Sequence, residues 1–161
     1  MLHMSREKTI ALGKKVPDFS GASTAGQFRL SACRGKILVL YFYPKDNTPG
    51  CTSESRDFAA ANAQFAAAGA RVVGVSRDSL ASHGRFRSKY ELPFELISDA
   101  DETLCSLFAV IRQKMMYGKS VRGIERSTFL IDGEGVLRHE WRGLKVAGHV
   151  AEVLQAVHAI G

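Results

Sequence analysis

The most constraining feature of the sequence is an uninterrupted run of seven apolar residues, ILVLYFY, at positions 37–43, which ends at Pro44. A strand with one face in water alternates apolar and polar residues, so this continuous β-branched and aromatic run indicates a strand buried on both faces. Strands of that kind occur where helices cover both sides of a sheet. The run therefore predicts an α/β protein with this strand in the interior of its sheet.

The rest of the chain alternates between strand and helix patterns. Strands are predicted at 71–76, 94–97, 127–131 and 136–141, and helices at 52–68, 79–90, 101–108 and 149–160. Gly69 should end the first helix, the turn at 132–135 should join the last two strands into a hairpin, and 19–30 should form a small N-terminal hairpin. This order predicts a thioredoxin-like architecture, a mixed central sheet flanked by helices.

Length and composition favour one domain that spans residues 1–161, with 1–8 as a flexible N-terminus. No apolar run approaches the roughly 20 residues that cross a bilayer, and the polar start does not resemble a secretory signal. We therefore expect a cytoplasmic protein that does not enter membranes. The net charge is +6, but Lys and Arg are interleaved with Asp and Glu, which favours a solvated surface over a nucleic-acid site.

The cysteines restrict the possible chemistry. Cys33, Cys51 and Cys105 are an odd number at wide spacing, and the chain has no C-x-x-C motif and no Cys/His pair at ligand spacing. A disulfide-stapled fold and a zinc site are therefore both disfavoured. The histidines show no metal spacing, and no nucleotide-binding loop is present, so we expect no metal and no cofactor. Trp141, Met115 and Met116 are interpreted as packing residues.

The segment between the run at 37–43 and the next helix is the expected site, because ligands of open α/β sheets bind beyond the carboxyl ends of strands. Cys51 falls in the first turn of that helix, where unpaired backbone N–H groups and the helix dipole favour a thiolate. Thr48 can place a hydroxyl beside the sulfur, and Pro44 stiffens the loop and excludes water from one side. The alternative is a Pro/Gly turn that carries an incidental cysteine.

This segment resembles a known family. The spacing Pro44-x-x-x-Thr48-x-x-Cys51 resembles the signature of peroxiredoxins, and FYPKDNTPGCT at 42–52 resembles their bacterioferritin comigratory protein branch, the Q subgroup. Further matches lie at 13–19, 74–79, 98–101, 116–119 and 126–132, so the resemblance covers nearly the whole chain. It implies a thioredoxin-like fold and a thiol-dependent peroxidase of the thioredoxin-dependent type, acting on hydrogen peroxide and organic hydroperoxides.

The resemblance also assigns residue roles. It makes Cys51 the peroxidatic nucleophile, with Thr48 and Pro44 beside it and Arg126 as the activating arginine. A guanidinium can stabilise a thiolate and polarise the O–O bond with a donor geometry that lysine lacks. Attack of the thiolate on a peroxide oxygen would release water or an alcohol and leave a sulfenic acid.

Glu54 complicates this picture, because a carboxylate in the first turn of the same helix would disfavour a thiolate. We expect Glu54 to act as an N-terminal capping residue of that helix. Its charge should be offset by Arg126 or by Arg56.

Two positions depart from the family pattern. Relatives often carry a resolving cysteine five residues after the peroxidatic one, where this chain has Arg56, or on the following helix, where it has Arg87. Cys105, among apolar neighbours, is expected in the core, and Cys33 is expected to be more exposed. Either is a possible resolving cysteine.

We nevertheless favour a one-cysteine cycle in which thioredoxin, glutathione or a glutaredoxin reduces oxidised Cys51 in a monomeric protein. Two alternatives stay open. One is a redox sensor without turnover. The other is a thioredoxin-like disulfide oxidoreductase, which the sequence Thr52-Ser53-Glu54 after Cys51 disfavours because it lacks a second cysteine.

Overall fold

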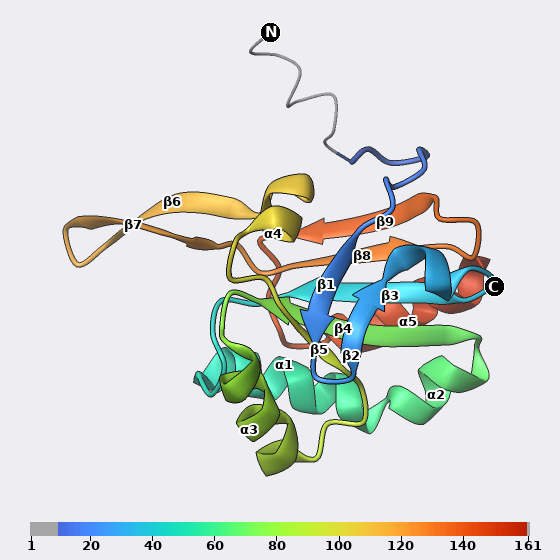
Figure 1. The fold of residues 1–161 in the computed structure, drawn as a ribbon, viewed down its shortest axis with the longest axis horizontal. Helices are drawn as coiled ribbons and strands as arrows, with labels where there is room; N and C mark the ends of the chain where they lie inside the picture. Colours follow the sequence, from blue (N-terminus) through green and yellow to red (C-terminus); the bar gives the residue numbers. More distant parts are fainter. Residues whose placement is uncertain (1–9, 161) are drawn as a thin grey trace, which may run out of the picture.

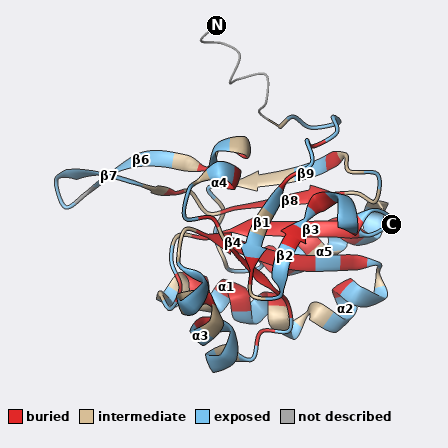
Figure 2. Ribbon diagram, viewed as in Figure 1, coloured by how far each residue is buried: buried red, intermediate tan, exposed pale blue. Residues whose placement is uncertain are grey.

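The apolar run forms strand β3 (Ile37–Phe42), inside a seven-stranded mixed sheet, in the computed structural model, which describes residues 10–160 (Figure 1). Every residue of β3 is buried, as predicted (Figure 2). The strand pairs in parallel with β4 (Ala70–Ser76) and antiparallel with β8 (Ser127–Ile131). The predicted flexible segment 1–8 lies outside the described residues.

The sheet has the strand order β2-β1-β5-β4-β3-β8-β9. Its other strands are β1 (Ser20–Ser23), β2 (Gly26–Arg29), β5 (Leu96–Ser98) and β9 (Leu137–Arg142). The helices are η2 (Leu30–Cys33), α1 (Pro49–Ala60), α2 (Asn62–Ala67), α3 (Leu80–Tyr90), α4 (Thr103–Leu107) and α5 (His149–Ile160). In the part of the chain that is described, no helix has the length and apolar character that a membrane crossing requires. The predicted thioredoxin-like arrangement, with both predicted hairpins, is confirmed.

Two hydrophobic cores lie on opposite faces of the sheet, because successive side chains of a strand point to opposite sides. The helix-side core joins the sheet to α1, α2, α3 and α5 and includes Val39, Tyr41, Cys51, Phe58, Phe65, Phe86 and Val153. The α4-side core includes Leu38, Leu40, Phe42, Cys33, Leu104, Cys105 and Phe129. Cys51 is thus separated from Cys33 and Cys105 by the sheet.

The predicted helix at 52–68 differs from the structure. It begins earlier, at Pro49, which suits the first position because proline lacks the N–H that would stay unpaired there. It is also divided in two at Ala61, where the alanine-rich sequence holds no residue that breaks helices. Gly69 follows with a φ of 79°, a left-handed conformation that glycine adopts without strain, so the predicted stop is confirmed.

Sequence reasoning missed a second small sheet, the hairpin of β6 (Ile111–Met116) and β7 (Lys119–Ile124), which projects from the body (Figure 1). Its two-residue turn is Tyr117-Gly118, and both residues have positive φ, as type I′ turns require. Gly118, which suits a tight hairpin turn, was the feature of the sequence that could have indicated this hairpin. Met115 is 71% exposed on this hairpin, so its assignment as a packing residue is wrong, whereas Trp141 packs against the helix-side core as predicted.

Candidate active site

The segment predicted to hold the site is the loop between β3 and α1, at the carboxyl end of β3. Thr48 is the N-cap of α1, Pro49 begins the helix, and Cys51 follows in its first turn. The Cys51 side chain is only 1% exposed and packs into the helix-side core. The N-terminus of α1 thus directs its unpaired backbone N–H groups to the region of the sulfur, an environment that favours negative charge.

Arg126 reaches Cys51 because of the strand register. It directly precedes β8, and the first residue of β8, Ser127, lies opposite Phe42 at the end of β3. The Nη2 of Arg126 lies 3.5 Å from Cys51 Sγ and donates a hydrogen bond to it. A Cβ atom on Gly50 would lie 3.1 Å from the same Nη2, so the glycine gives the guanidinium room beside the helix.

Glu54 completes a cluster with these two residues. Its Oε1 accepts a hydrogen bond from Arg126 Nη1 at 2.8 Å, so the predicted charge offset by Arg126 is confirmed. The predicted capping role is wrong, because the carboxylate is turned into the protein and makes no cap hydrogen bond. The other arginine considered, Arg56, instead stacks over the Tyr90 ring at 6.0 Å.

Burial dominates the electrostatics of Glu54. The side chain is fully buried, and its Oε2 has no hydrogen-bond partner among the described residues. Desolvation raises the pKa of this carboxyl to about 7, although the Arg126 charge acts to lower it. Burial therefore favours the protonated form of this carboxyl, which limits the negative charge that it brings to the Cys51 cluster.

The other two predicted loop residues take less direct positions. The Thr48 hydroxyl donates to the Lys45 carbonyl at 2.9 Å, so in this state its proton is turned away from the sulfur. Its lone pairs remain available, and its role toward a bound peroxide stays a prediction. Pro44 follows β3 after Tyr43 and is half-buried, and the stiffening role given to it stays a prediction.

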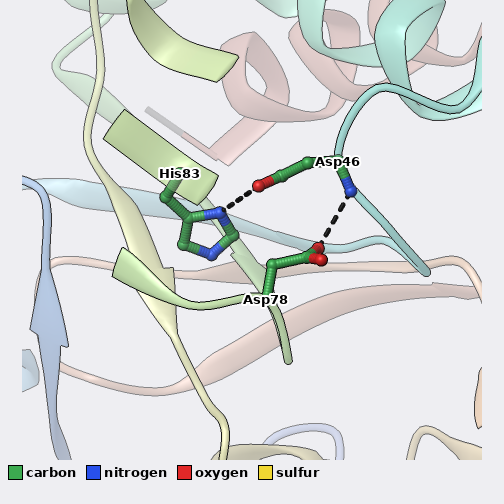
Figure 3. Close-up of side chains that lie close together, drawn as sticks. All are labelled: Asp46, Asp78 and His83. Carbon is green, nitrogen blue, oxygen red and sulfur yellow. Dashed lines mark hydrogen bonds and ion pairs between the residues drawn. The ribbon is translucent and has the colours of Figure 1, made fainter. Parts of the chain in front are cut away.

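A buried polar network behind the loop was not predicted from the sequence. Asp46, His83 and Asp78 come from the loop, from α3 and from the segment after β4, and they converge in Figure 3. His83 Nδ1 lies 2.8 Å from Asp46 Oδ2, and the Asp46 N–H donates to Asp78 Oδ2 at 2.9 Å. The packing of α3 beside the ends of β3 and β4 brings these residues together, and no local pattern in the sequence indicates that contact.

These three residues are the one group within residues 10–160 whose ligand atoms are close enough for a cation, within 4.8 Å of one another. Their atoms already have protein partners, however. His83 Nε2 faces the Ile97 carbonyl at 2.9 Å, and Asp46 accepts from the Tyr43 and Ser82 hydroxyls at 2.7 Å each. The atoms that would have to bind a metal ion are already engaged in hydrogen bonds within the protein. The three residues therefore do not fit a metal site.

The two remaining cysteines are buried and unpaired. Cys33 is 5% exposed and Cys105 0%, so Cys33 is the more exposed of the two, as expected, although it too is buried. It ends η2, before β3, whereas Cys51 follows β3, and a six-residue strand separates two such positions by roughly 20 Å. Cys105 lies on α4 in the α4-side core, where burial and the neighbouring Asp99 carboxylate raise its pKa far above the ordinary value.

Comparisons with known proteins point to one family. A model of the AhpC/TSA family matches residues 12–140. The chain is 55% identical over 133 residues to Peroxiredoxin Bcp of Xanthomonas campestris pv. campestris, covering 83% of each chain. It is 49% identical over 150 residues to Peroxiredoxin Bcp of Bacillus subtilis, covering 92% of this chain and 96% of the relative.

A solved structure of the Xanthomonas campestris bacterioferritin comigratory protein, from work on its alkyl peroxide reduction activity, has the same fold. It superposes with a TM-score of 0.83 at 51% identity, over 88% of this chain and 90% of that one. The match to the family model, over residues 12–140, covers the region from the loop before Cys51 to the strand after Arg126.

Proposed function

Because the chain belongs to the AhpC/TSA family, in the bacterioferritin comigratory protein (Q) subgroup of the peroxiredoxins, we propose that it reduces hydroperoxides with Cys51 as the nucleophile. Membership supports a thiol-dependent peroxidase with an antioxidant role. The single observation that carries the assignment of the residue is the contact between Arg126 Nη2 and Cys51 Sγ at the start of α1. No other cysteine in residues 10–160 combines a helix N-terminus with an arginine contact.

The reaction follows from the positions of the groups. The Cys51 thiolate attacks one oxygen of the peroxide, an S–O bond forms, and the O–O bond breaks. Cys51 then carries a sulfenic acid, and the other oxygen leaves with the electron pair and takes a proton as water or an alcohol. The Arg126 guanidinium and the N–H groups at the start of α1 stabilise the negative charge that moves from sulfur to the leaving oxygen. Thr48 and Pro44 orient the peroxide and exclude competing water.

The reductive half of the cycle uses an external thiol. Arg56 and Arg87 occupy the positions where resolving cysteines were expected, and Cys33 and Cys105 lie across the sheet from Cys51. A thiol therefore displaces water from the sulfenic acid to form a mixed disulfide, and a second thiol releases Cys51. Thioredoxin, glutaredoxin and glutathione are the expected donors, which suits a cytoplasmic, monomeric protein that keeps its thiols reduced.

The test is the intact mass of the reduced protein after about one equivalent of hydrogen peroxide, with and without a sulfenic-acid trap. We expect a single trapped adduct on Cys51 and no internal disulfide. The Cys51→Ser variant serves as the control and should form no adduct. A loss of about two mass units that maps to a bond between Cys51 and Cys105 or Cys33 would contradict the one-cysteine cycle.

A further inference from the structure

The network of Asp46 and His83 joins the reactive loop to α3. Asp46 lies in the loop five residues before Cys51, and His83 lies on the buried face of α3 (Figure 3). The histidine is fully buried, and Asp46 is nearly so. This pair is therefore shielded from water, where an ion pair holds its geometry more firmly than on the surface.

The hydrogen-bond partners fix the protonation of the pair. His83 Nε2 faces a carbonyl, which can only accept, so this nitrogen carries a proton. His83 Nδ1 faces Asp46 Oδ2, and the two Asp46 oxygens also accept from the hydroxyls of Tyr43 and Ser82. We take Asp46, which accepts from these two hydroxyls, as a carboxylate, and a carboxylate only accepts, so the bond to Asp46 needs a proton on Nδ1. The pair is thus an imidazolium and a carboxylate.

We propose that the Asp46–His83 ion pair is a latch that positions the loop before Cys51 for attack on the peroxide. The latch acts on the loop backbone, because the Asp46 N–H donates to Asp78 while its side chain is held by His83. Two residues further on, Thr48 caps α1 and begins the turn that carries Cys51. Asp46 and His83 are positioning residues, since neither contacts the sulfur.

The latch should oppose the second half of the cycle. Cys51 is almost inaccessible in this state, so an external thiol needs the loop or the start of α1 to open before it reaches the oxidised sulfur. Opening separates Asp46 from His83 and exposes both to water. A weakened latch should therefore slow oxidation by peroxide without slowing reduction by a thiol, a selective effect that a general loss of stability would not produce.

Two substitutions of the same residue separate the latch from mere packing. In His83→Gln the amide nitrogen takes the place of Nε2 and keeps the bond to Ile97, but the bond to Asp46 is lost. In His83→Asn the amide nitrogen takes the place of Nδ1 and keeps the bond to Asp46, but the bond to Ile97 is lost. Both variants remove the same charge and one buried hydrogen bond, so they should lose similar stability.

The measurement is the second-order rate constant for peroxide oxidation of Cys51, with urea unfolding in parallel. We expect His83→Gln to be slower than wild type by about 10- to 100-fold, the effect of displacing a reacting group by up to about 1 Å. His83→Asn should stay within about fivefold of wild type, the difference between a charged and a neutral hydrogen bond. Reduction of the oxidised His83→Gln protein by a small thiol should be at least as fast as in wild type.

The protonation has its own signature, the nitrogen-15 chemical shifts of the imidazole ring. Both ring nitrogens of His83 should carry a proton in the wild-type protein, because each faces an acceptor. Equal slowing in the Gln and Asn variants, or a Gln variant within fivefold of wild type, would refute the latch. The inference rests on the proposed peroxidase, but the two fail separately, because loss of the latch leaves the complete dependence of peroxide reduction on Cys51 intact.

Discussion

Cys51 and Cys33 lie at opposite ends of β3, and each contacts an arginine that also pairs with a glutamate. The Cys51 cluster consists of Cys51, Arg126 and Glu54, and the Cys33 cluster consists of Cys33, Arg71 and Glu95. The nitrogen–sulfur distance is 3.5 Å in both. An arginine contact with a glutamate behind it is therefore not what distinguishes the proposed catalytic cysteine from the other one.

The difference lies in the backbone around each sulfur. Cys51 stands in the first turn of a 12-residue helix, whereas Cys33 is the last residue of the short helix η2. The Cys33 thiol donates to the Arg29 carbonyl at 3.9 Å, which a thiolate could not do. Burial raises the pKa of Cys33 despite the opposing effect of Arg71, so the thiol form is favoured there. Helix position decides which of the two sulfurs receives stabilisation as an anion.

The glutamates differ as well. Glu95 has partners for both carboxylate oxygens, Arg71 for one and the Ser23 hydroxyl at 2.5 Å for the other. Glu54 has a partner for only one, Arg126. The Cys33 cluster therefore resembles a satisfied structural ion pair, while the Cys51 cluster keeps an unsatisfied group beside the sulfur, as is common where a site is built for chemistry.

Replacement of each cysteine by serine should give the largest difference in peroxide reduction between the two clusters. Cys51→Ser should abolish peroxide reduction, because serine at neutral pH is not ionised and forms no sulfenic acid. Cys33→Ser should oxidise at the wild-type rate, and so should Cys105→Ser. Peroxide consumption with excess reductant measures all three variants. Residual peroxidase activity in Cys51→Ser, or loss of activity in Cys33→Ser, would contradict the assignment of Cys51, rather than Cys33, as the nucleophile.

Removal of the arginines tests the comparison at the next level. Arg126→Ala should slow oxidation of Cys51 by roughly 10²- to 10³-fold, since a donor aimed at developing charge is lost. Arg71→Ala should leave this rate within about twofold, although it leaves the buried Glu95 without its ion-pair partner and so lowers stability. Stopped-flow oxidation rates at a temperature where circular dichroism shows both variants folded are the measurement. Equal slowing in the two would mean that the guanidinium acts through the fold.

Much of the Cys51 cluster could be predicted from the sequence because its signals are local. The loop and the start of α1 lie within a few residues of Cys51, and β3 corresponds to one continuous apolar run in the sequence. Arg126 required the family resemblance, because 75 residues separate it from Cys51 and only the antiparallel pairing of β8 with β3 brings it near.

The Cys33 cluster and the His83 network could not be predicted. Arg71 contacts both Cys33 and Glu95, and all three residues are far apart in the sequence. No local sequence pattern therefore indicates these contacts. His83 appears on a helix without any metal or catalytic spacing, and its partner Asp46 lies 37 residues earlier. Such contacts depend on the order of the strands in the sheet, and local sequence patterns carry no information on that strand order.

Glu54 provides the smallest and most specific test. Its folded pKa of about 7 exceeds the ordinary value of 4.5, so the folded state holds a proton that the unfolded state releases between these pH values. The stabilising effect is therefore complete below about pH 4.5 and is lost as pH rises through 7, with an upper limit of about 3 kcal/mol. Glu54→Gln does not titrate, so the free energy of unfolding of wild type relative to this variant should fall between pH 5 and pH 8.

Urea unfolding of both proteins at about pH 5 and pH 8 measures this difference. Glu102→Gln is the matched control, because hydrogen bonds from Arg122 and Arg77 lower the pKa of Glu102 to about 2, and the group stays ionised across the whole interval. Its difference from wild type should therefore be flat. A flat difference for Glu54→Gln as well would show that Arg126 outweighs burial and keeps Glu54 ionised. Glu54 would then be a charged partner of Arg126, and the contrast between the clusters would reduce to the position of each cysteine in its helix and to the unpartnered Glu54 Oε2.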